Sequence, residues 1–165
     1  AATARALEAR VPGLSVIVSV APGMTIDRAR CPYPQVAGAS FTVLRAATAS
    51  LCKSGTNTLE AAVAGCPHIL AYRAAPLSYA IARRVVRVPH IGLVNLVAGR
   101  EISREFIQDA VVPARMVEAL LPLLDAGSAT RDEAVVALDA VRAALGQPGA
   151  SGRVAAMAHA LTRAT

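Results

Sequence analysis

The stretch that most constrains the fold places a helix between two short apolar segments. Ser50-Leu-Cys52 and His68-Ile-Leu-Ala-Tyr72 are brief apolar runs, which predicts two strands. Between them, Asn57 with Glu60 three residues later predicts a capped helix start, and Gly-Cys-Pro at 65–67 predicts the helix end. Two successive strands joined by a helix pair in parallel, with a right-handed crossover. The stretch therefore predicts an α/β fold.

The rest of the chain continues this alternation of strands and helices. We expect further strands at 14–20 and 91–94, and a long connection at 22–40 that holds only a weak helix near 24–29. The expected helices cover residues 3–10, 41–48, 76–86, 103–108, 113–124, 130–145 (opened by a capping box of Thr130 and Glu133) and the segment after 152.

This order of elements predicts a Rossmann-like parallel sheet flanked by helices, with a helical carboxyl-terminal tail. The first predicted element is a helix, so the first strand of such a sheet is expected to be missing. We predict a truncated Rossmann-like domain at 1–125 and carboxyl-terminal helices at 126–165. Ligands of such sheets bind at the carboxyl ends of the strands, which here carry the loops after Cys52, Tyr72 and Val94.

Charge and composition narrow the class of partner. Seventeen Lys and Arg residues against eleven Asp and Glu residues give a net charge of +6, which indicates an anionic partner. Aromatic residues make up 3% of the chain, with no Trp, so stacking platforms for nucleic acid are scarce and we expect none to bind. No apolar stretch reaches membrane-spanning length and no leader is recognisable, so a cytoplasmic protein is expected. Cys31, Cys52 and Cys66 lack metal or disulfide spacing and are expected to be buried thiols.

The candidate site residues each have an ordinary structural reading beside the functional one. Ser54-Gly55-Thr56 is either a capped turn or an anion site, in which the helix dipole and free N–H groups meet a phosphate. Glu60 either offsets the dipole or accepts from a ribose hydroxyl. Asn95 is an Asx turn or a ligand contact, and Arg100 with Glu101 is a surface ion pair or a phosphate contact. The three histidines have no metal-pair spacing, so no metal is expected.

An ordered series of short motifs carries a family resemblance. The motifs are Ser54-Gly-Thr-x-x-Leu-Glu60, Cys66-Pro67, Tyr72-Arg73-x-x-Pro76, Ala82-Arg-Arg84 and Asn95-Leu-x-Ala-Gly-Arg-Glu101. The series resembles the lipid-A-disaccharide synthases, strongly over residues 42–124 and only in pattern elsewhere.

The resemblance implies a two-domain glycosyltransferase of the B-type fold, needing no cofactor. Such enzymes join a UDP-2,3-diacylglucosamine donor to a 2,3-diacylglucosamine 1-phosphate acceptor and release UDP. The carboxyl-terminal domain of the family holds the donor, which implies donor contacts at Ser54, Gly55, Thr56, Glu60, Asn95, Gly99, Arg100 and Glu101. Of these, Asn95 and Arg100 would stabilise the leaving group.

Departures from the family pattern limit what the chain is expected to do. Val94 stands where the family has Pro, Lys53 stands where it has a small apolar residue, and the family's Leu-Pro-Gly-Ser-Arg-type loop and amino-terminal domain are absent. We therefore expect the chain alone to be inactive, with the general base supplied from elsewhere. Arginines at 73, 83, 84 and 87 form a solvated face or meet a membrane surface peripherally.

Two other functions remain open at this level. A non-catalytic UDP-binding or oligomerisation module would keep the fold without the chemistry, and a UDP-sugar epimerase of the same fold would need acid and base residues that we do not find. The family's carboxyl-terminal helices exchange between subunits, and residues 130–163 could form a homodimer in the same way.

Overall fold

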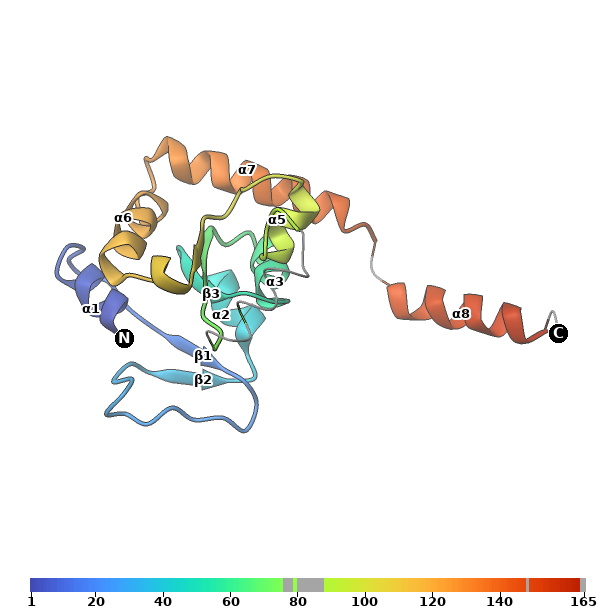
Figure 1. Cartoon of the computed structure of the whole chain (residues 1–165), viewed down its shortest axis with the longest axis horizontal. Helices are drawn as coiled ribbons and strands as arrows, with labels where there is room; N and C mark the ends of the chain where they lie inside the picture. The colour runs from blue at the N-terminus through green and yellow to red at the C-terminus, as the bar shows by residue number, and fades with distance from the viewer. Residues whose placement is uncertain (76–78, 80–87, 148, 164–165) are drawn as a thin grey trace.

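The computed structural model describes residues 1–75, 79, 88–147 and 149–163. These residues form an α/β body from which a last helix projects (Figure 1). The strands are β1 (Val18–Val20), β2 (Gln35–Ala37), β3 (Ser50–Lys53), β4 (His68–Tyr72) and β5 (Glu105–Ile107). The helices are α1 (Ala2–Glu8), α2 (Ser40–Ala46), α3 (Asn57–Ala64), α5 (Leu93–Ala98), the 3₁₀ turn η1 (Gln108–Ala110), α6 (Pro113–Leu124), α7 (Ala129–Ala144) and α8 (Ala150–Arg163).

The strands form two parallel sheets, one of β1 and β2 and one in the order β3-β4-β5. The parallel pairing of β3 with β4, joined through α3, confirms the prediction made from residues 50–72. The structure thus has the predicted α/β class with parallel sheets and flanking helices.

The central strand β4 divides the core into two layers, because neighbouring residues of a strand point to opposite faces. Ile69 joins Phe106 and the apolar side of α6, with Leu7 of α1, in one buried cluster. Leu70 joins a second cluster, whose other buried members are Ala62 of α3, Val94 of α5, and Leu138 and Val141 of α7. Helices therefore cover both faces of the three-stranded sheet, and α7 belongs to the packed body.

The prediction for residues 91–108 is wrong in its order of elements. Residues 91–94 were expected as a strand, but α5 covers Leu93–Ala98, with Gly92 as its N-cap. Residues 103–108 were expected to begin a helix, but Glu105–Ile107 is the strand β5, with Phe106 buried between partly exposed neighbours. The short apolar run 91–94 suits either a strand or a buried helix, and the buried contacts of Val94 and Asn95 select the helix.

Smaller differences concern the amino-terminal third and the N-caps of α3 and α7. Of the strand expected at 14–20, only residues 18–20 form a strand, β1. Residues 24–29 form no helix, and the strand β2 was not predicted. The side chain of Gln35 instead bonds both the N–H and the carbonyl of Ile26 and holds this connection. Thr56, not Asn57, is the N-cap of α3, and Ser128 rather than Thr130 precedes α7; neither makes a side-chain capping bond.

The cysteines agree with the sequence interpretation: Cys31, Cys52 and Cys66 are free and buried. Burial raises the pKa of the Cys52 thiol to about 11, so this thiol stays protonated at neutral pH.

The helix α8 stands apart from the body in Figure 1. Its described side chains are exposed, including Val154, Met157 and Leu161, which are 65%, 68% and 73% exposed. The predicted helix exists, while the domain division at 125/126 and any exchange between subunits stay predictions. Within the described residues, no helix is both long and apolar enough to cross a membrane.

Candidate functional site

The Ser54–Thr56 turn lies at the carboxyl end of β3 and opens α3. The N–H of Ser54 donates to the carbonyl of Ala71 over 3.4 Å, which continues the ladder between β3 and β4. Gly55 then adopts φ +137°, a conformation that L side chains rarely adopt, and a Cβ there would meet open space. Thr56 is exposed. The turn therefore places a partly exposed glycine and an exposed threonine at the start of a helix, where backbone N–H groups favour an anion.

The Ser54 hydroxyl is engaged in a hydrogen bond within the protein. It donates to the carbonyl of Ile91 over 3.0 Å, a contact across 37 positions of sequence. Thr58, in the first turn of α3, donates its hydroxyl to the carbonyl of Gly55 over 2.9 Å, and Glu60 lies partly exposed in the same turn. The two hydroxyls thus fix the turn from both sides, while Thr56 is exposed.

Asn95 lies inside the protein, with none of its surface exposed. Its Nδ2 donates to the carbonyl of Ser103 over 2.7 Å and to Glu105 Oε1 over 2.8 Å, and its Oδ1 accepts from the N–H groups of Ile102 and Ser103, both over 2.9 Å. An amide has two N–H donors and one carbonyl acceptor, so this set engages all its groups. Asn95 holds the 99–104 loop in place. Its contact with a sugar-nucleotide donor stays a prediction.

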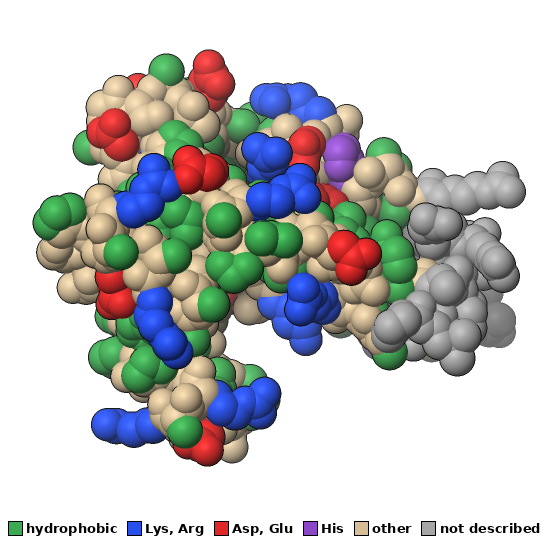
Figure 2. Space-filling view, turned by 60° about the vertical axis from the view of Figure 1, so that its left-hand side comes forward, with side chains coloured by type: hydrophobic (Ala, Val, Ile, Leu, Met, Phe, Trp, Pro, Cys, Tyr) green, Lys and Arg blue, Asp and Glu red, His purple; other side chains and the backbone are tan. Residues whose placement is uncertain are grey.

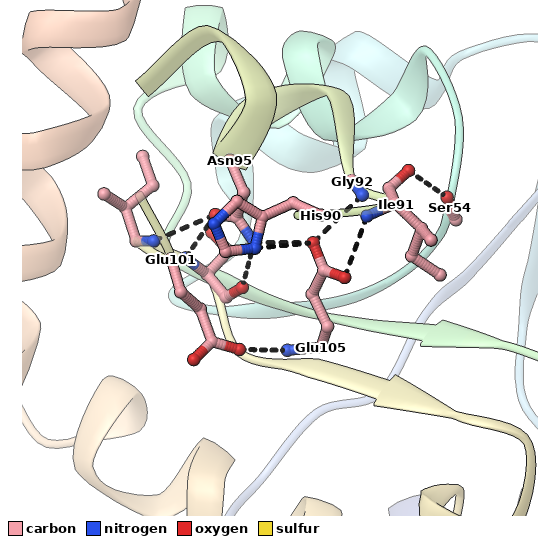
Figure 3. A network of polar contacts seen from close by, with 9 residues as sticks. Ser54, His90, Ile91, Gly92, Asn95, Glu101 and Glu105 are labelled. Carbon is pink, nitrogen blue, oxygen red and sulfur yellow. Dashed lines mark hydrogen bonds and ion pairs between the residues drawn. The ribbon is translucent and has the colours of Figure 1, made fainter. Parts of the chain in front are cut away.

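Glu105 is the member of this site that sequence reasoning missed. Its side chain is 7% exposed. Its carboxylate accepts from the N–H of Ile91 and the N–H of Gly92, both over 3.0 Å, besides Asn95 (Figure 3). His90 lies nearby, with Nδ1 3.9 Å from Oε1. Residues 103–108 were expected to begin a helix, and no spacing in the sequence connects Glu105 to 91 or 95.

Gly99, Arg100 and Glu101 lie beyond the carboxyl end of α5. Gly99 caps the helix with φ +67°, and Arg100 and Glu101 are exposed. Glu101 accepts from the backbone N–H of Glu105 over 3.0 Å, so it contacts this backbone rather than forming the expected pair with Arg100 within the described part of the chain. Six residues of helix span about 9 Å, which separates this end of α5 from the end that meets Ser54. The structure thus brings Ser54 to the start of α5, while Arg100 lies beyond the other end of this helix.

A second polar contact ties the carboxyl ends of β4 and β5 together. Gln108 has φ +50°, and its side-chain amide bonds both the N–H and the carbonyl of Ala74, over 2.8 and 3.1 Å. Arg73 donates to the carbonyls of Gln108 and Val111. The other arginines of the predicted basic group, at 83, 84 and 87, and the helix expected at 76–86 lie outside the described residues, apart from the single residue Tyr79.

Within the residues that the structure describes, no group of three or more His, Cys, Asp or Glu side chains could hold an ion. The face in Figure 2 intersperses Lys and Arg with acidic side chains and has no continuous basic patch. A cavity of about 260 Å³ lies where β1 and β2 end, lined by residues that include Met24, Arg28 and Tyr33, none of them in the predicted site.

Comparisons with known proteins agree with the resemblance. A family model described as "Lipid-A-disaccharide synthetase" matches residues 6–159. Curated proteins named lipid-A-disaccharide synthase are similar over most of the chain. The one from Acidobacterium capsulatum is 43% identical over 132 residues (79% of this chain and 33% of that protein), and the one from Anaeromyxobacter sp. (strain K) is 41% identical over 162 residues (92% and 42%). The one from Pseudomonas paraeruginosa is 37% identical over 169 residues (98% and 44%). The chain spans less than half the length of these relatives.

Proposed function

Because the chain belongs to the lipid-A-disaccharide synthetase family, we propose that it forms the donor-binding part of a glycosyltransferase. The donor would be UDP-2,3-diacylglucosamine and the acceptor 2,3-diacylglucosamine 1-phosphate. The observation that carries this proposal is the Ser54–Thr56 turn, which opens α3 at the carboxyl end of β3. Parallel sheets bind their ligands at this edge.

The chemical contribution of the turn is stabilisation of the leaving group. As the glycosidic bond to UDP breaks, negative charge develops on the diphosphate. The N–H groups at the start of α3 carry the positive end of the helix dipole, and the Thr56 hydroxyl can donate to the same oxygens. Glu60 would accept from a ribose hydroxyl. The turn is fixed before ligand arrives, by Ser54 on one side and Thr58 on the other, so little ordering is required on binding.

Calorimetric titration of the full chain with UDP tests this proposal. We expect micromolar binding that Thr56→Val weakens about tenfold, since a hydrogen bond to a charged group contributes about 1.5–3 kcal/mol. Thr130→Val, which changes an exposed threonine of α7, is the matched control and should bind as the wild type does. Absence of UDP binding by the folded wild-type chain, or equal binding by Thr56→Val, would overturn the proposal.

The second candidate is a non-catalytic oligomerisation module, and α8 is the observation that favours it. Val154, Met157 and Leu161 recur at spacings of three and four residues, which places them along one side of the helix, and all are exposed. A homodimer through α8 is compatible with donor binding. Tight self-association without UDP binding would favour this second candidate over the first.

A further inference from the structure

We propose that Glu105 is a positioning residue, which holds the Ser54–Thr56 turn in place by fixing the backbone at Ile91 and Gly92. This inference rests on the proposed function, because the turn is the proposed contact with the diphosphate. Glu105 comes from β5, on the far side of β4 from the turn in the sheet order β3-β4-β5. It is buried and would not touch the donor itself.

The carboxylate is matched to three donors. Oε2 accepts from Ile91, and Oε1 accepts from Gly92 and from Asn95 Nδ2. These bonds also satisfy backbone groups at the start of α5, which makes no side-chain capping bond of its own. A buried carboxylate is costly to desolvate unless such donors surround it. The three donors therefore give the carboxylate a defined position.

Gly92 lets this carboxylate approach. A Cβ at Gly92 would lie 2.5 Å from Leu70 Cδ2 and 3.1 Å from Glu105 Oε1. Because Leu70 has no exposed surface, its side chain has little room to move aside. The close approach of backbone to carboxylate is thus built into the packing of α5 on β4.

Ile91 connects the Glu105 carboxylate to the Ser54–Thr56 turn. Its N–H is held by Glu105, while its carbonyl accepts from the Ser54 hydroxyl (Figure 3). Both polar backbone groups of one residue are therefore engaged, one by the carboxylate and the other by the turn. Displacement of the carboxylate should loosen Ile91 and, through Ser54, the backbone of Gly55 and Thr56.

The test compares Glu105→Gln with Ser54→Ala in the full chain. A carboxamide of the same size has one acceptor oxygen and places an NH₂ group against N–H donors, so it cannot replace the carboxylate. We expect each variant to weaken UDP binding about tenfold, and the double variant to weaken it about tenfold rather than a hundredfold. Effects that multiply would show that the two residues act independently and would overturn the inference.

A matched control and a ligand-free measurement complete the test. Glu118→Gln makes the same chemical change on an exposed residue of α6, which pairs with Arg10, and should bind UDP as the wild type does. Amide hydrogen exchange of Ser54 and Thr58, whose N–H groups donate to the carbonyls of Ala71 and Gly55, should quicken without ligand in Glu105→Gln and not in Glu118→Gln. If the wild type binds no UDP, the proposed function fails, and this exchange measurement still decides the role of Glu105.

Should Glu105→Gln fail to fold, the Ser54→Ala variant alone tests the inference. Coupling through Ile91 predicts that this variant quickens exchange of the Ile91 amide, which donates to Glu105 rather than to Ser54. Unchanged exchange at Ile91 in folded Ser54→Ala would overturn the inference.

Discussion

Two motifs of this chain that carry the family resemblance differ in what they face. Ser54-Gly-Thr56 has two polar residues around a glycine, and Asn95-Leu-Val-Ala-Gly99 has one polar residue and a glycine. The first turns its backbone and Thr56 toward solvent, at a glycine with φ +137°. The second turns Asn95 inward, with no exposed surface and with its amide fully bonded. A polar motif near a ligand site can therefore contact the ligand or stabilise the fold. The burial of its polar side chains distinguishes these two roles.

This difference sets how a loss of activity should be interpreted. A substitution at the exposed Thr56 of the outward turn removes a group that a ligand can meet, with little change inside the protein. A substitution at Asn95 removes bonds that hold the 99–104 loop to α5 and β5. Reduced turnover in an Asn95 variant therefore does not demonstrate contact with the donor, and its stability has to be measured beside its activity.

The largest expected effect on stability is that of Asn95→Ala. It removes the four hydrogen bonds of the amide and leaves the buried N–H of Ser103 without its acceptor, so the free energy of unfolding should fall by about 3 kcal/mol. Chemical denaturation measures the change. A loss below about 1 kcal/mol would place Asn95 with the outward turn rather than with the scaffold.

Gly92→Ala is expected to have the next largest effect. The added methyl group would press on Leu70 and on the Glu105 carboxylate, and overpacking of this kind costs about 1–3 kcal/mol. Thermal and chemical denaturation measure the change, with Gly152→Ala as the control. A Cβ at Gly152 on α8 meets nothing within 4 Å, so the control should be neutral or slightly stabilising. Equal stability of the two variants would show that the close packing at Gly92 is unimportant.

The comparison extends to His68, a buried side chain with a hydrogen bond at one of its two ring nitrogens. Its Nδ1 bonds the carbonyl of Cys66 over 3.0 Å, so Nδ1 carries the proton, and Nε2 is buried without a hydrogen-bond partner among the described residues. Burial lowers the pKa of His68 from its ordinary value of 6.5. The unfolded chain then takes up a proton more readily than the folded one as pH falls below 6.5.

Stability should therefore be highest above pH 6.5 and decline as the pH falls below that value. Denaturation measured across this range, compared between the wild type and His68→Gln, isolates the contribution of the imidazole. If both proteins lose the same stability between pH 7 and pH 5, His68 is not the group responsible.

The smallest expected effect is that of Asn57→Ala, at the edge of the outward turn. The sequence pattern predicted Asn57 as the N-cap of α3, and loss of such a cap costs about 1 kcal/mol. The structure places Asn57 as the first helical residue, after Thr56, so the change should stay within about 0.5 kcal/mol. A loss near 1 kcal/mol in a denaturation experiment would favour the capping interpretation instead.

Local signals predicted some elements well and failed where distant contacts decide. The strand β4 and the helix α3 were predicted because polar residues, glycine and proline bound each of them closely. Residues 91–108 were predicted in the wrong order, because the N-cap at Gly92 depends on a carboxylate 13 positions away. Glu105 escaped notice for the same reason: its partners come together only when β5 joins β4.

The outward turn was predicted more fully than the buried network. Ser54, Gly55 and Thr56 sit between a strand and a helix, and the sequence alone places such a turn at the edge of a sheet. The tie from Ser54 to Ile91 spans 37 residues, including the segment 76–87, and no local pattern indicates it. Sequence reasoning thus located the surface of the candidate site but not the contacts that hold it.

The division of the core by β4 has a consequence for how genes of this kind can change in length. Ile69 and Leu70 are neighbours in the chain but belong to different clusters. Insertion or deletion of one codon in β4 would exchange the faces of all later residues in the strand, and would disturb both clusters at once. A codon gained or lost at 145–147, between α7 and the exposed α8, would disturb neither. Length variation should therefore be tolerated between α7 and α8 and rejected within β4.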